Sequence, residues 1–353
     1  MYSTYVQNLT LTLFGESHGP AVGCVLDGFP PGFRPDLHRL AAFMARRAPG
    51  STPGSTPRRE TDAPEILSGL HDGLTTGAPI AALVRNADTH SSDYAPFATV
   101  PRPGHADYPL SVKTAGANDP RGGGHSSGRL TAGLCFAGAL ALQYLETKGI
   151  AVSSRIAAIA GRPVAAPTDP SGLDAAARDA IEAARRDSDS VGGVIEATVT
   201  GLPPGLGEPI FGGVENRLAA ILFGIPAVKG VEFGSGFAGA ALRGSKNNDP
   251  YFIAPDGAVR TLTNNHGGAL GGITTGMPLL VRVAVKPTPS LGRPQQSVDL
   301  RARADTPLVV HGRHDACIVP RARPVVEAAA AIAALDLLLG PSPIICQKPR
   351  NAK

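Results

Sequence analysis

The stretch DGFPPGF at residues 27–33 returns as TGLPPGL at residues 200–206, each time directly after an apolar run that is typical of a strand. Each copy is followed by the tetrapeptide RLAA, at 39–42 and again at 217–220, inside a segment with helical periodicity. One short match would be chance, but two in the same order indicate that the chain contains a duplicated unit.

A third pair of segments extends the repeat. GLTTGAPI at 73–80 matches GITTGMPL at 272–279, and both copies lead into an apolar run. No Ser/Gly-rich or charged linker separates the two copies, so we expect them to share one core. The sequence therefore predicts a single α+β domain with internal pseudo-symmetry, built from halves at about 8–160 and 190–340.

Apolar periodicity predicts individual strands and helices. Alternating apolar residues indicate strands, and apolar residues three and four apart indicate helices. Asp36 is a plausible N-cap, and Gly149 marks a helix end. The predicted strands cover 8–14, 21–28 and 192–200, and the predicted helices cover 36–47, 126–149, 173–186 and 324–339.

Composition narrows the class of ligand. The 353 residues are 42% hydrophobic, enough for a sizeable core, and the formal net charge is +4. The chain has no tryptophan and only 5% aromatic residues, a poor basis for stacking nucleic-acid bases. We therefore expect small anionic ligands rather than nucleic acid.

The cysteines and the apolar segments indicate the cellular compartment in which we expect the protein. Cys24, Cys135, Cys317 and Cys346 lie far apart without CxxC spacing, which favours reduced thiols and no metal site. The longest apolar segment, 328–339, is short for a membrane span and carries a charged aspartate. No signal-peptide pattern opens the chain, and we expect a cytoplasmic protein without a membrane segment.

The stretch RGGGHSSGR at 121–129 cannot serve to fill a core. A glycine-rich turn that feeds a helix start exposes backbone amides and the positive end of the helix dipole, which favours anions. Arg121 and Arg129 add positive charge. A flexible turn with a capping serine is the alternative, but it gives both arginines no role.

Two further stretches place histidines in tight turns. In FGESHG (14–19), Ser17 and His18 can share a proton, and histidine titrates near neutral pH, so acid–base chemistry is the functional interpretation. A purely structural histidine is the alternative, and no G-x-S-x-G elbow supports a hydrolase. In RPGHADY (102–108), His105 is either part of a turn with Asp107 or held rigidly for proton transfer.

Charged residues cluster in two stretches, at 44–62 and at 311–324, and each cluster has a functional and a structural interpretation. His311 and His314 have metal-like spacing but no evident third ligand, so acid–base or structural roles are favoured over a metal. Asp315 forms either a surface ion pair with Arg313 or a positioned carboxylate. The arginines at 46, 47, 58 and 59 form either a solvated face or a clamp that binds carboxylate or phosphate bidentately.

Taken together, a series of motifs along nearly the whole chain resembles the chorismate synthase family. The resemblance implies a β–α–β sandwich with internal pseudo-twofold duplication, assembled as a homotetramer. The motifs are FGESHG, RRAPG, TPRRETD, ILSG, RPGHADY, RGGGHSSGR, IPAVKGVEFG, RGSKNND, NNHGGALGGITTG, KPTPS and GRHDACIVPRARP.

The resemblance also implies a reaction. Family members convert 5-enolpyruvylshikimate 3-phosphate to chorismate and phosphate, the last step of the shikimate pathway, with reduced FMN as cofactor. This 1,4-anti elimination has no net redox change: phosphate leaves and a hydrogen is lost from C6. Reduced flavin donates an electron transiently and recovers it, and a leaving phosphate needs cations and a general acid.

Five catalytic roles carry over by resemblance. His18 would protonate the departing phosphate, with Ser17 in its relay, and His105 would serve the N1 region of the reduced flavin. Ser127 would link to this network, and Asp315 would assist removal of the C6 proton.

The resemblance also assigns the binding residues. FMN would be held by His125, Ser126, Ser127, Pro226, Ala227, Gly271, Lys286, Thr288, Ser290 and Arg313. The phosphate and carboxylates of the substrate would be held by Arg46, Arg47, Arg59 and Arg129. The chain departs from the common family pattern GGGRSSARET, since His125 replaces the first arginine and Leu130 the glutamate.

Two other functions remain as alternatives. A flavin-dependent oxidoreductase could use the same pocket on a small anionic substrate, and a non-catalytic anion or nucleic-acid binder is the third possibility. The chain has no added reductase-like module, so we expect an external reductant to supply reduced flavin rather than NADPH oxidation by this protein.

Overall fold

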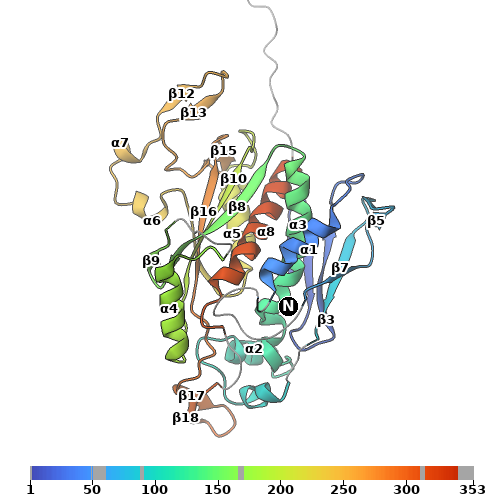
Figure 1. Cartoon of the computed structure of the whole chain (residues 1–353), viewed down its shortest axis with the longest axis vertical. Coiled ribbons are helices and arrows are strands. Elements are labelled where there is room, and N and C mark those ends of the chain that lie inside the picture. Colours follow the sequence, from blue (N-terminus) through green and yellow to red (C-terminus); the bar gives the residue numbers. More distant parts are fainter. Residues whose placement is uncertain are drawn as a thin grey trace, which may run out of the picture.

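The computed structural model describes residues 2–48, 50, 61–87, 91–165, 171–310 and 315–340. Two five-stranded antiparallel sheets form its outer layers (Figure 1). The first contains, in spatial order, β1 (Thr4–Val6), β2 (Thr10–Gly15), β3 (Ala21–Asp27), β7 (Ile80–Arg85) and β4 (Pro64–Ile66). The second contains β9 (Arg162–Pro163), β8 (Ala151–Ile159), β10 (Gly193–Thr200), β16 (Leu279–Val285) and β11 (Val228–Phe233).

The two sheets repeat the same strand order. In the first, β2, β3, β7 and β4 are neighbours, and in the second β8, β10, β16 and β11 take the equivalent places. The stretch 27–33 begins at the end of β3, and its copy at 200–206 begins at the end of β10. The internal duplication predicted from the repeated motifs is thus present in the sheet topology.

Four helices fill the space between the sheets. They are α1 (Leu37–Arg47), α3 (Thr131–Glu146), α5 (Val214–Phe223) and α8 (Val319–Leu338). Helix α3 packs on β3 and β7, α8 packs on β8 and β10, and the two helices pack on each other, as Figure 1 shows. This arrangement confirms the predicted β–α–β sandwich.

Helices α3 and α8 are enclosed on nearly all sides: every residue of α3 from Thr131 to Ala141 and of α8 from Pro324 to Leu337 is buried. The two helices are in tight contact at Gly138, where a Cβ atom would overlap the side chain and backbone of Ala328. The missing side chain lets the two helix axes come together, and it places one continuous core between the sheets.

The remaining elements surround this core. Helix α4 (Ala175–Arg186) packs against β8. The other helices are η1 (Ser91–Ala98), α2 (Asp107–Lys113), η2 (Arg121–Ser126), η3 (Gly128–Leu130), η4 (Ile210–Gly212), α6 (Gly236–Gly239) and α7 (Gly244–Asn247). The other strands are β5 (Leu70–His71), β6 (Leu74–Thr75), β12 (Tyr251–Ile253), β13 (Val259–Thr261), β14 (Ala269–Leu270), β15 (Ile273–Thr274), β17 (Gln295–Asp299) and β18 (Ala304–Leu308).

Most predicted elements are present, but two helix starts were wrong. Asp36 caps α1 as predicted, accepting hydrogen bonds from the backbone of His38 and Arg39. Helix α3 begins at Thr131 rather than 126, because the backbone of Ser127 is extended and Gly128–Leu130 form a separate 3-10 turn before the helix. Helix α8 begins at Val319, five residues before the predicted start, with Pro324 inside it.

Among the described residues, no helix is long and apolar enough to cross a membrane. Within the same part of the chain, no three His, Cys, Asp or Glu side chains gather as a metal site would require.

We predict that Gly138→Ala destabilises the protein although alanine is the better helix former. Helix propensity alone would favour alanine by about 1 kcal/mol, whereas overpacking against Ala328 costs about 1–3 kcal/mol. Adding Ala328→Gly should recover most of the loss, because it restores the space between the helices. Urea unfolding of the two single variants and the double variant measures this coupling, and a fully additive result would contradict the tight contact.

Candidate active site

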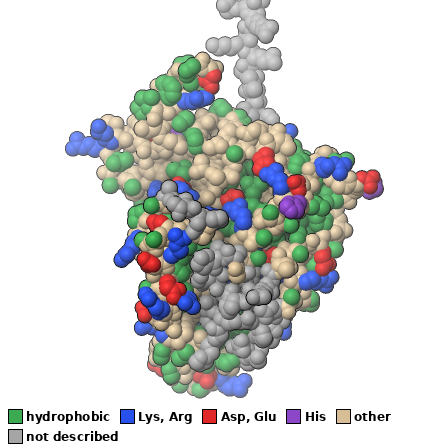
Figure 2. All heavy atoms as spheres, in the orientation of Figure 1, with side chains coloured by type: hydrophobic (Ala, Val, Ile, Leu, Met, Phe, Trp, Pro, Cys, Tyr) green, Lys and Arg blue, Asp and Glu red, His purple; other side chains and the backbone are tan. Residues whose placement is uncertain are grey.

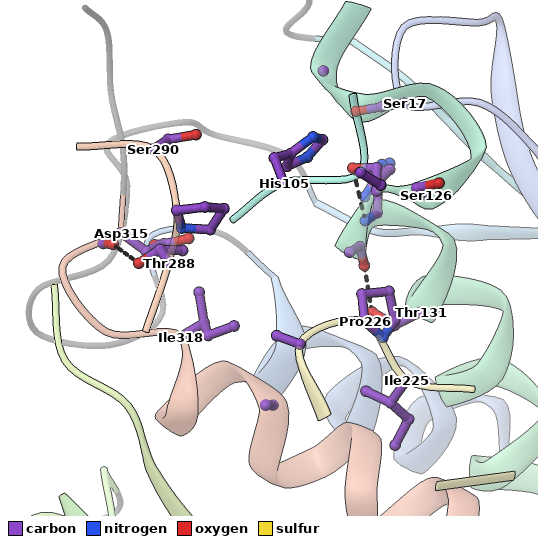
Figure 3. A pocket seen from close by; sticks show the side chains of 18 of the residues that line it. Ser17, His105, Ser126, Thr131, Ile225, Pro226, Thr288, Ser290, Asp315 and Ile318 are labelled. Carbon is purple, nitrogen blue, oxygen red and sulfur yellow. Dashed lines mark hydrogen bonds between the residues drawn. The ribbon is translucent and has the colours of Figure 1, made fainter. Parts of the chain in front are cut away.

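A cavity of about 460 Å³ lies where α3 and α8 begin (Figure 3). Thr131 at the start of α3 and Arg321 in the first turn of α8 both line it. Backbone N–H groups at a helix start carry partial positive charge, so two helix starts at one cavity favour an anionic ligand. Figure 3 shows His105 between the Thr288–Asp315 side and the Ser17–Ser126 side of this cavity.

Ser17 and His18 lie in the turn between β2 and β3. Both are buried, with 3% and 7% of their surface exposed, although they are polar. The Asn86 side chain fixes the turn by donating to the backbone oxygens of Glu16 and Gly19. Ser17 lines the cavity, and the His18 ring stands edge-on to Tyr94 with 4.9 Å between centroids.

The glycine stretch passes between the two predicted catalytic histidines. Gly122, Gly123 and Gly124 all have positive φ, at 60°, 85° and 53°, a region that favours glycine. A Cβ atom on Gly122 would lie 2.5 Å from Cδ2 of His18, and one on Gly123 would lie 3.1 Å from Cε1 and Nε2 of His105. All three glycines therefore suit the turn, and Gly122 and Gly123 also leave room for the imidazoles of His18 and His105.

His105 is held by charged neighbours from its own loop. Its Nδ1 lies 2.6 Å from Oδ1 of Asp107, and the guanidinium of Arg102 binds the same carboxylate at 2.8 Å through both Nε and NH2. These contacts hold the His105 imidazole in place, and they are compatible with both interpretations of this turn.

Asp315 lies on the opposite wall. Its Oδ2 accepts a hydrogen bond from Arg321 at 2.7 Å, and its backbone oxygen accepts one from the Thr288 hydroxyl at 2.6 Å. Arg321 also donates to the backbone oxygen of Arg47 at 3.2 Å, so the carboxylate is connected to the arginine-lined wall.

Two predicted substrate-binding arginines meet at one buried carboxylate. Arg47 and Arg129 both donate to Asp62, which is 2% exposed, and both line the cavity. Burial alone would raise the pKa of the Asp62 carboxyl, but the two guanidinium groups outweigh it and lower this pKa, so Asp62 is anionic. The cluster carries one net positive charge.

Arg46 is not among the residues that line the cavity, because its guanidinium binds both oxygens of Glu327 on α8 at 2.9 Å. Arg59 and Arg313, also predicted to bind ligands, lie outside the described residues, as do His311 and His314.

Most of the predicted flavin-binding residues lie together. Ser126, Ser127, Pro226, Ala227, Lys286, Thr288 and Ser290 all line the cavity. His125 instead lines an adjacent cavity of about 650 Å³, and its ring nitrogens bind the Ser3 hydroxyl at 2.6 Å and the Gly15 carbonyl at 2.8 Å. Gly271 lies in the turn between β14 and β15 and lines neither cavity.

Sequence reasoning did not assign roles to several residues of the site. Arg102, Arg321 and Asp62 all lie inside stretches that were singled out, namely RPGHADY, GRHDACIVPRARP and TPRRETD. Their charge, close in sequence to predicted site residues, could have marked them as candidates. Only the fold shows which ion pairs they form, namely Arg102 with Asp107, Arg321 with Asp315, and Asp62 with Arg47 and Arg129.

Three comparisons with known proteins agree with one another. The family model described as chorismate synthase matches residues 9–339. A chorismate synthase of Korarchaeum cryptofilum is 48% identical over 94% of this chain and 96% of its own length. One of Thermococcus kodakarensis is 50% identical over the same shares. A crystal structure of a chorismate synthase superposes with a TM-score of 0.73 at 29% identity, covering 95% of this chain and 93% of the other.

We predict that Gly122→Ala is much more destabilising than Gly116→Ala. Gly116 also has a positive φ, of 80°, but no atom lies within 4 Å of its Cβ position. Both variants should therefore lose about 1 kcal/mol from backbone strain, and Gly122→Ala about 1–3 kcal/mol more because it displaces His18 and Ser17. Equal midpoints in urea unfolding would show that the turn does not hold His18.

Proposed function

The chain belongs to the chorismate synthase family, and we propose that the cavity at the start of α3 and α8 is its active site. The reaction of this lyase is the 1,4-anti elimination of phosphate from 5-enolpyruvylshikimate 3-phosphate to give chorismate. The observation that carries the proposal is the convergence of Ser17, His105 and Asp315, from distant chain positions, on one cavity. The flavin-dependent oxidoreductase weighed above is not favoured, because the family match names a lyase.

We propose that the substrate's phosphate and carboxylates bind along the arginine-lined wall. Arg47 and Arg129 would make these contacts directly, helped by the helix starts, and both are already fixed by Asp62. Arg46 and Arg59 stay in the proposed set, with Arg46 acting from its ion pair with Glu327. Guanidinium groups suit this task because they bind oxyanions in a planar, bidentate fashion.

Proton transfers occur at the two ends of the substrate. His18 would donate a proton to the departing phosphate, with Ser17 beside it at the cavity surface. At the other end, Asp315 would assist removal of the C6 proton, and its bond to Arg321 keeps it oriented toward that task. Burial of Ser17 and His18 excludes water from the leaving group.

The donor set of the cavity fits reduced FMN. The wall has an apolar side formed by Ile225, Pro226, Ala227 and Ile318, suitable for a planar ring system. The same cavity is lined by one ammonium and several hydroxyls that suit the ribityl phosphate, from Lys286, Ser126, Ser127, Thr288 and Ser290. When bound, reduced FMN supplies an electron transiently and recovers it. His105 would hold a proton near its N1, while His125, Gly271 and Arg313 remain further proposed contacts.

We further propose that residues 1–353 form one catalytic domain of two related halves, about 8–160 and 190–340. Support comes from the matching strand orders of the two sheets and from the core that α3 and α8 share.

A homotetramer is proposed on the exposed apolar surface around β12 and β13. Figure 2 shows apolar side chains on this projecting hairpin. Ile253 on β12 is 69% exposed, its cross-strand partner Val259 on β13 is 58% exposed, and Leu262 directly after β13 is 68% exposed. Such clustered apolar exposure is typical of surfaces that another chain covers.

We place the protein in the cytoplasm and expect an external reductant to supply reduced flavin. Free thiols are typical of a reducing compartment. Cys24, Cys135 and Cys317 are unpaired, and burial raises the pKa of each thiol to about 12, so all three are chemically inert.

The proposed function predicts chorismate formation only with reduced flavin. In an anaerobic assay with dithionite-reduced FMN and the enolpyruvyl substrate, wild type should release chorismate and phosphate in equal amounts. His18→Ala should lower kcat by about 10²–10⁴-fold, because a general acid is lost. His38→Ala, on the exposed face of α1, is the matched control and should retain wild-type kcat.

Two outcomes would contradict this assignment. If the wild-type protein yields no chorismate under these conditions, the proposed function is wrong. If kcat falls equally in His18→Ala and His38→Ala, the proposed function stands but His18 is not the general acid.

The proposed assembly predicts that charge on the hairpin breaks the tetramer. The double variant Ile253→Asp, Val259→Asp, which changes a cross-strand pair of the hairpin, should elute as smaller species in size-exclusion chromatography with light scattering, because buried charge is costly at an interface. Leu67→Asp, 61% exposed in the other half of the chain, is the control. A monomeric wild type, or a double variant with the mass of four chains, would disprove this interface.

A further inference from the structure

The imidazole of His105 has two ring nitrogens, and its surroundings decide which one carries the proton. Nδ1 lies 2.6 Å from Oδ1 of Asp107 and 3.2 Å from NH2 of Arg102. A carboxylate oxygen approaches an imidazole nitrogen this closely only when a proton lies between them, because two lone pairs would repel. The short contact therefore places a proton on Nδ1, and the longer contact to Arg102 is secondary.

Asp107 is fixed as an anion on its other side. It accepts hydrogen bonds from the backbone N–H of Arg102 at 3.0 Å and from the Nε and NH2 groups of the same residue at 2.8 Å. Burial alone would raise the pKa of the Asp107 carboxyl, but bonds from Arg102 and His105 outweigh it and hold this pKa well below its usual range. The carboxylate thus remains an acceptor.

Arg102 is itself locked in place by a second, small apolar cluster. Its guanidinium carbon lies 4.6 Å from the centroid of the Phe97 ring and 5.8 Å from that of the Tyr94 ring. The β17–β18 hairpin supports the same loop, since the Ser297 hydroxyl donates to the backbone oxygen of Pro101 at 2.5 Å. The pair Arg102–Asp107 is therefore a rigid support rather than a mobile surface ion pair.

The remaining nitrogen of His105 faces the glycine turn. A Cβ atom on Gly123 would lie 3.1 Å from Nε2, so no side chain stands between Nε2 and this part of the cavity wall. Arg102 also contacts the Ser290 hydroxyl at 3.3 Å, which connects the support to the segment proposed to hold flavin.

We propose that Asp107, held by Arg102, is a positioning residue that fixes the Nδ1–H tautomer of His105 and leaves Nε2 as the proton-exchanging atom. The importance of this for turnover rests on the proposed function, but the tautomer itself does not. Asp107 touches neither the reacting atoms nor the cavity lining, so it acts only through the histidine.

The substitution Asp107→Asn removes the negative charge and changes the hydrogen-bonding pattern that His105 meets, while it keeps the size and shape of the side chain. Arg102 can only donate hydrogen bonds, so it will hold the amide oxygen and turn the amide NH₂ group toward His105. Nδ1 must then accept a hydrogen bond, and the proton moves to Nε2. The variant should reverse the tautomer while leaving the size of the side chain unchanged.

Long-range ¹H–¹⁵N spectra of ¹⁵N-histidine-labelled protein without flavin, at about pH 9 where imidazoles are neutral, read the tautomer directly. His105→Gln identifies the His105 signals among the nine histidines. Wild type should show Nδ1–H and Asp107→Asn should show Nε2–H. A wild-type His105 with half or more of its protons on Nε2, or an unchanged tautomer in a folded Asp107→Asn, overturns the proposal.

Turnover supplies the second readout. Asp107→Asn should lower kcat by about 100-fold or more, with KM changed by less than about threefold, since a misplaced proton affects chemistry rather than binding. Glu182→Gln removes the carboxylate from an exposed ion pair with Arg185 on α4 and should leave both constants unchanged.

The spectrum tests the tautomer of His105, and the turnover assay tests the proposed function, so each proposal can fail without the other. A wild type that makes no chorismate defeats the proposed function, yet its spectrum still decides the tautomer. If Asp107→Asn does not fold, the wild-type spectrum alone supports or overturns the assignment.

Discussion

The close contact between α3 and α8 is the constraint on which the rest of the structure depends. Gly138 leaves no side chain at the crossing, so Ala328 packs directly against the α3 backbone. Each helix also carries the apolar face of its own sheet, and moving one helix would separate a sheet from the core. Because both helices begin at the same end of the molecule, their contact also brings the two helix starts to one cavity. One interaction between two helices therefore organises both the core and the cavity proposed to bind an anion.

Duplication supplies the scaffold, and divergence at equivalent places supplies the chemistry. In the first half the segment before the final helix is a glycine turn that passes between His18 and His105. In the second half the segment before α8 carries Asp315, held by Arg321. A symmetric scaffold thus presents an asymmetric cavity, which Ser17, His105 and Asp315 line from different elements, with His18 beside Ser17 but not among the lining residues. In the proposed mechanism this asymmetry matters, since one end of the substrate would gain a proton and the other would lose one.

The sequence was sufficient for the topology because repeated motifs mark equivalent turns, and for α1 because Asp36 caps it locally. The start of α3 could not be predicted from periodicity, since it is set by the extended backbone of Ser127 and the 3-10 turn Gly128–Leu130, which no spacing of apolar residues marks. The paired states of the arginines were equally out of reach. Asp62 follows Arg47 by fifteen residues and precedes Arg129 by sixty-seven, and only the tertiary fold makes one carboxylate serve both.

The arginines of the cavity wall are bound to carboxylates before any ligand arrives. Arg47 and Arg129 share Asp62, Arg102 binds Asp107, and Arg321 binds Asp315. Pairing reduces the net charge that the cavity offers to an anion, and this weakens simple electrostatic attraction. It also removes the cost of ordering long, flexible side chains at the moment of binding, because their geometry is already fixed. For a reaction in which charge develops on a departing phosphate, dipoles and cations that need not reorganise stabilise the transition state more than they stabilise the bound substrate. In the proposed active site, the paired carboxylates would thus lower the affinity for bound substrate and favour the transition state, because the arginines are already rigidly held.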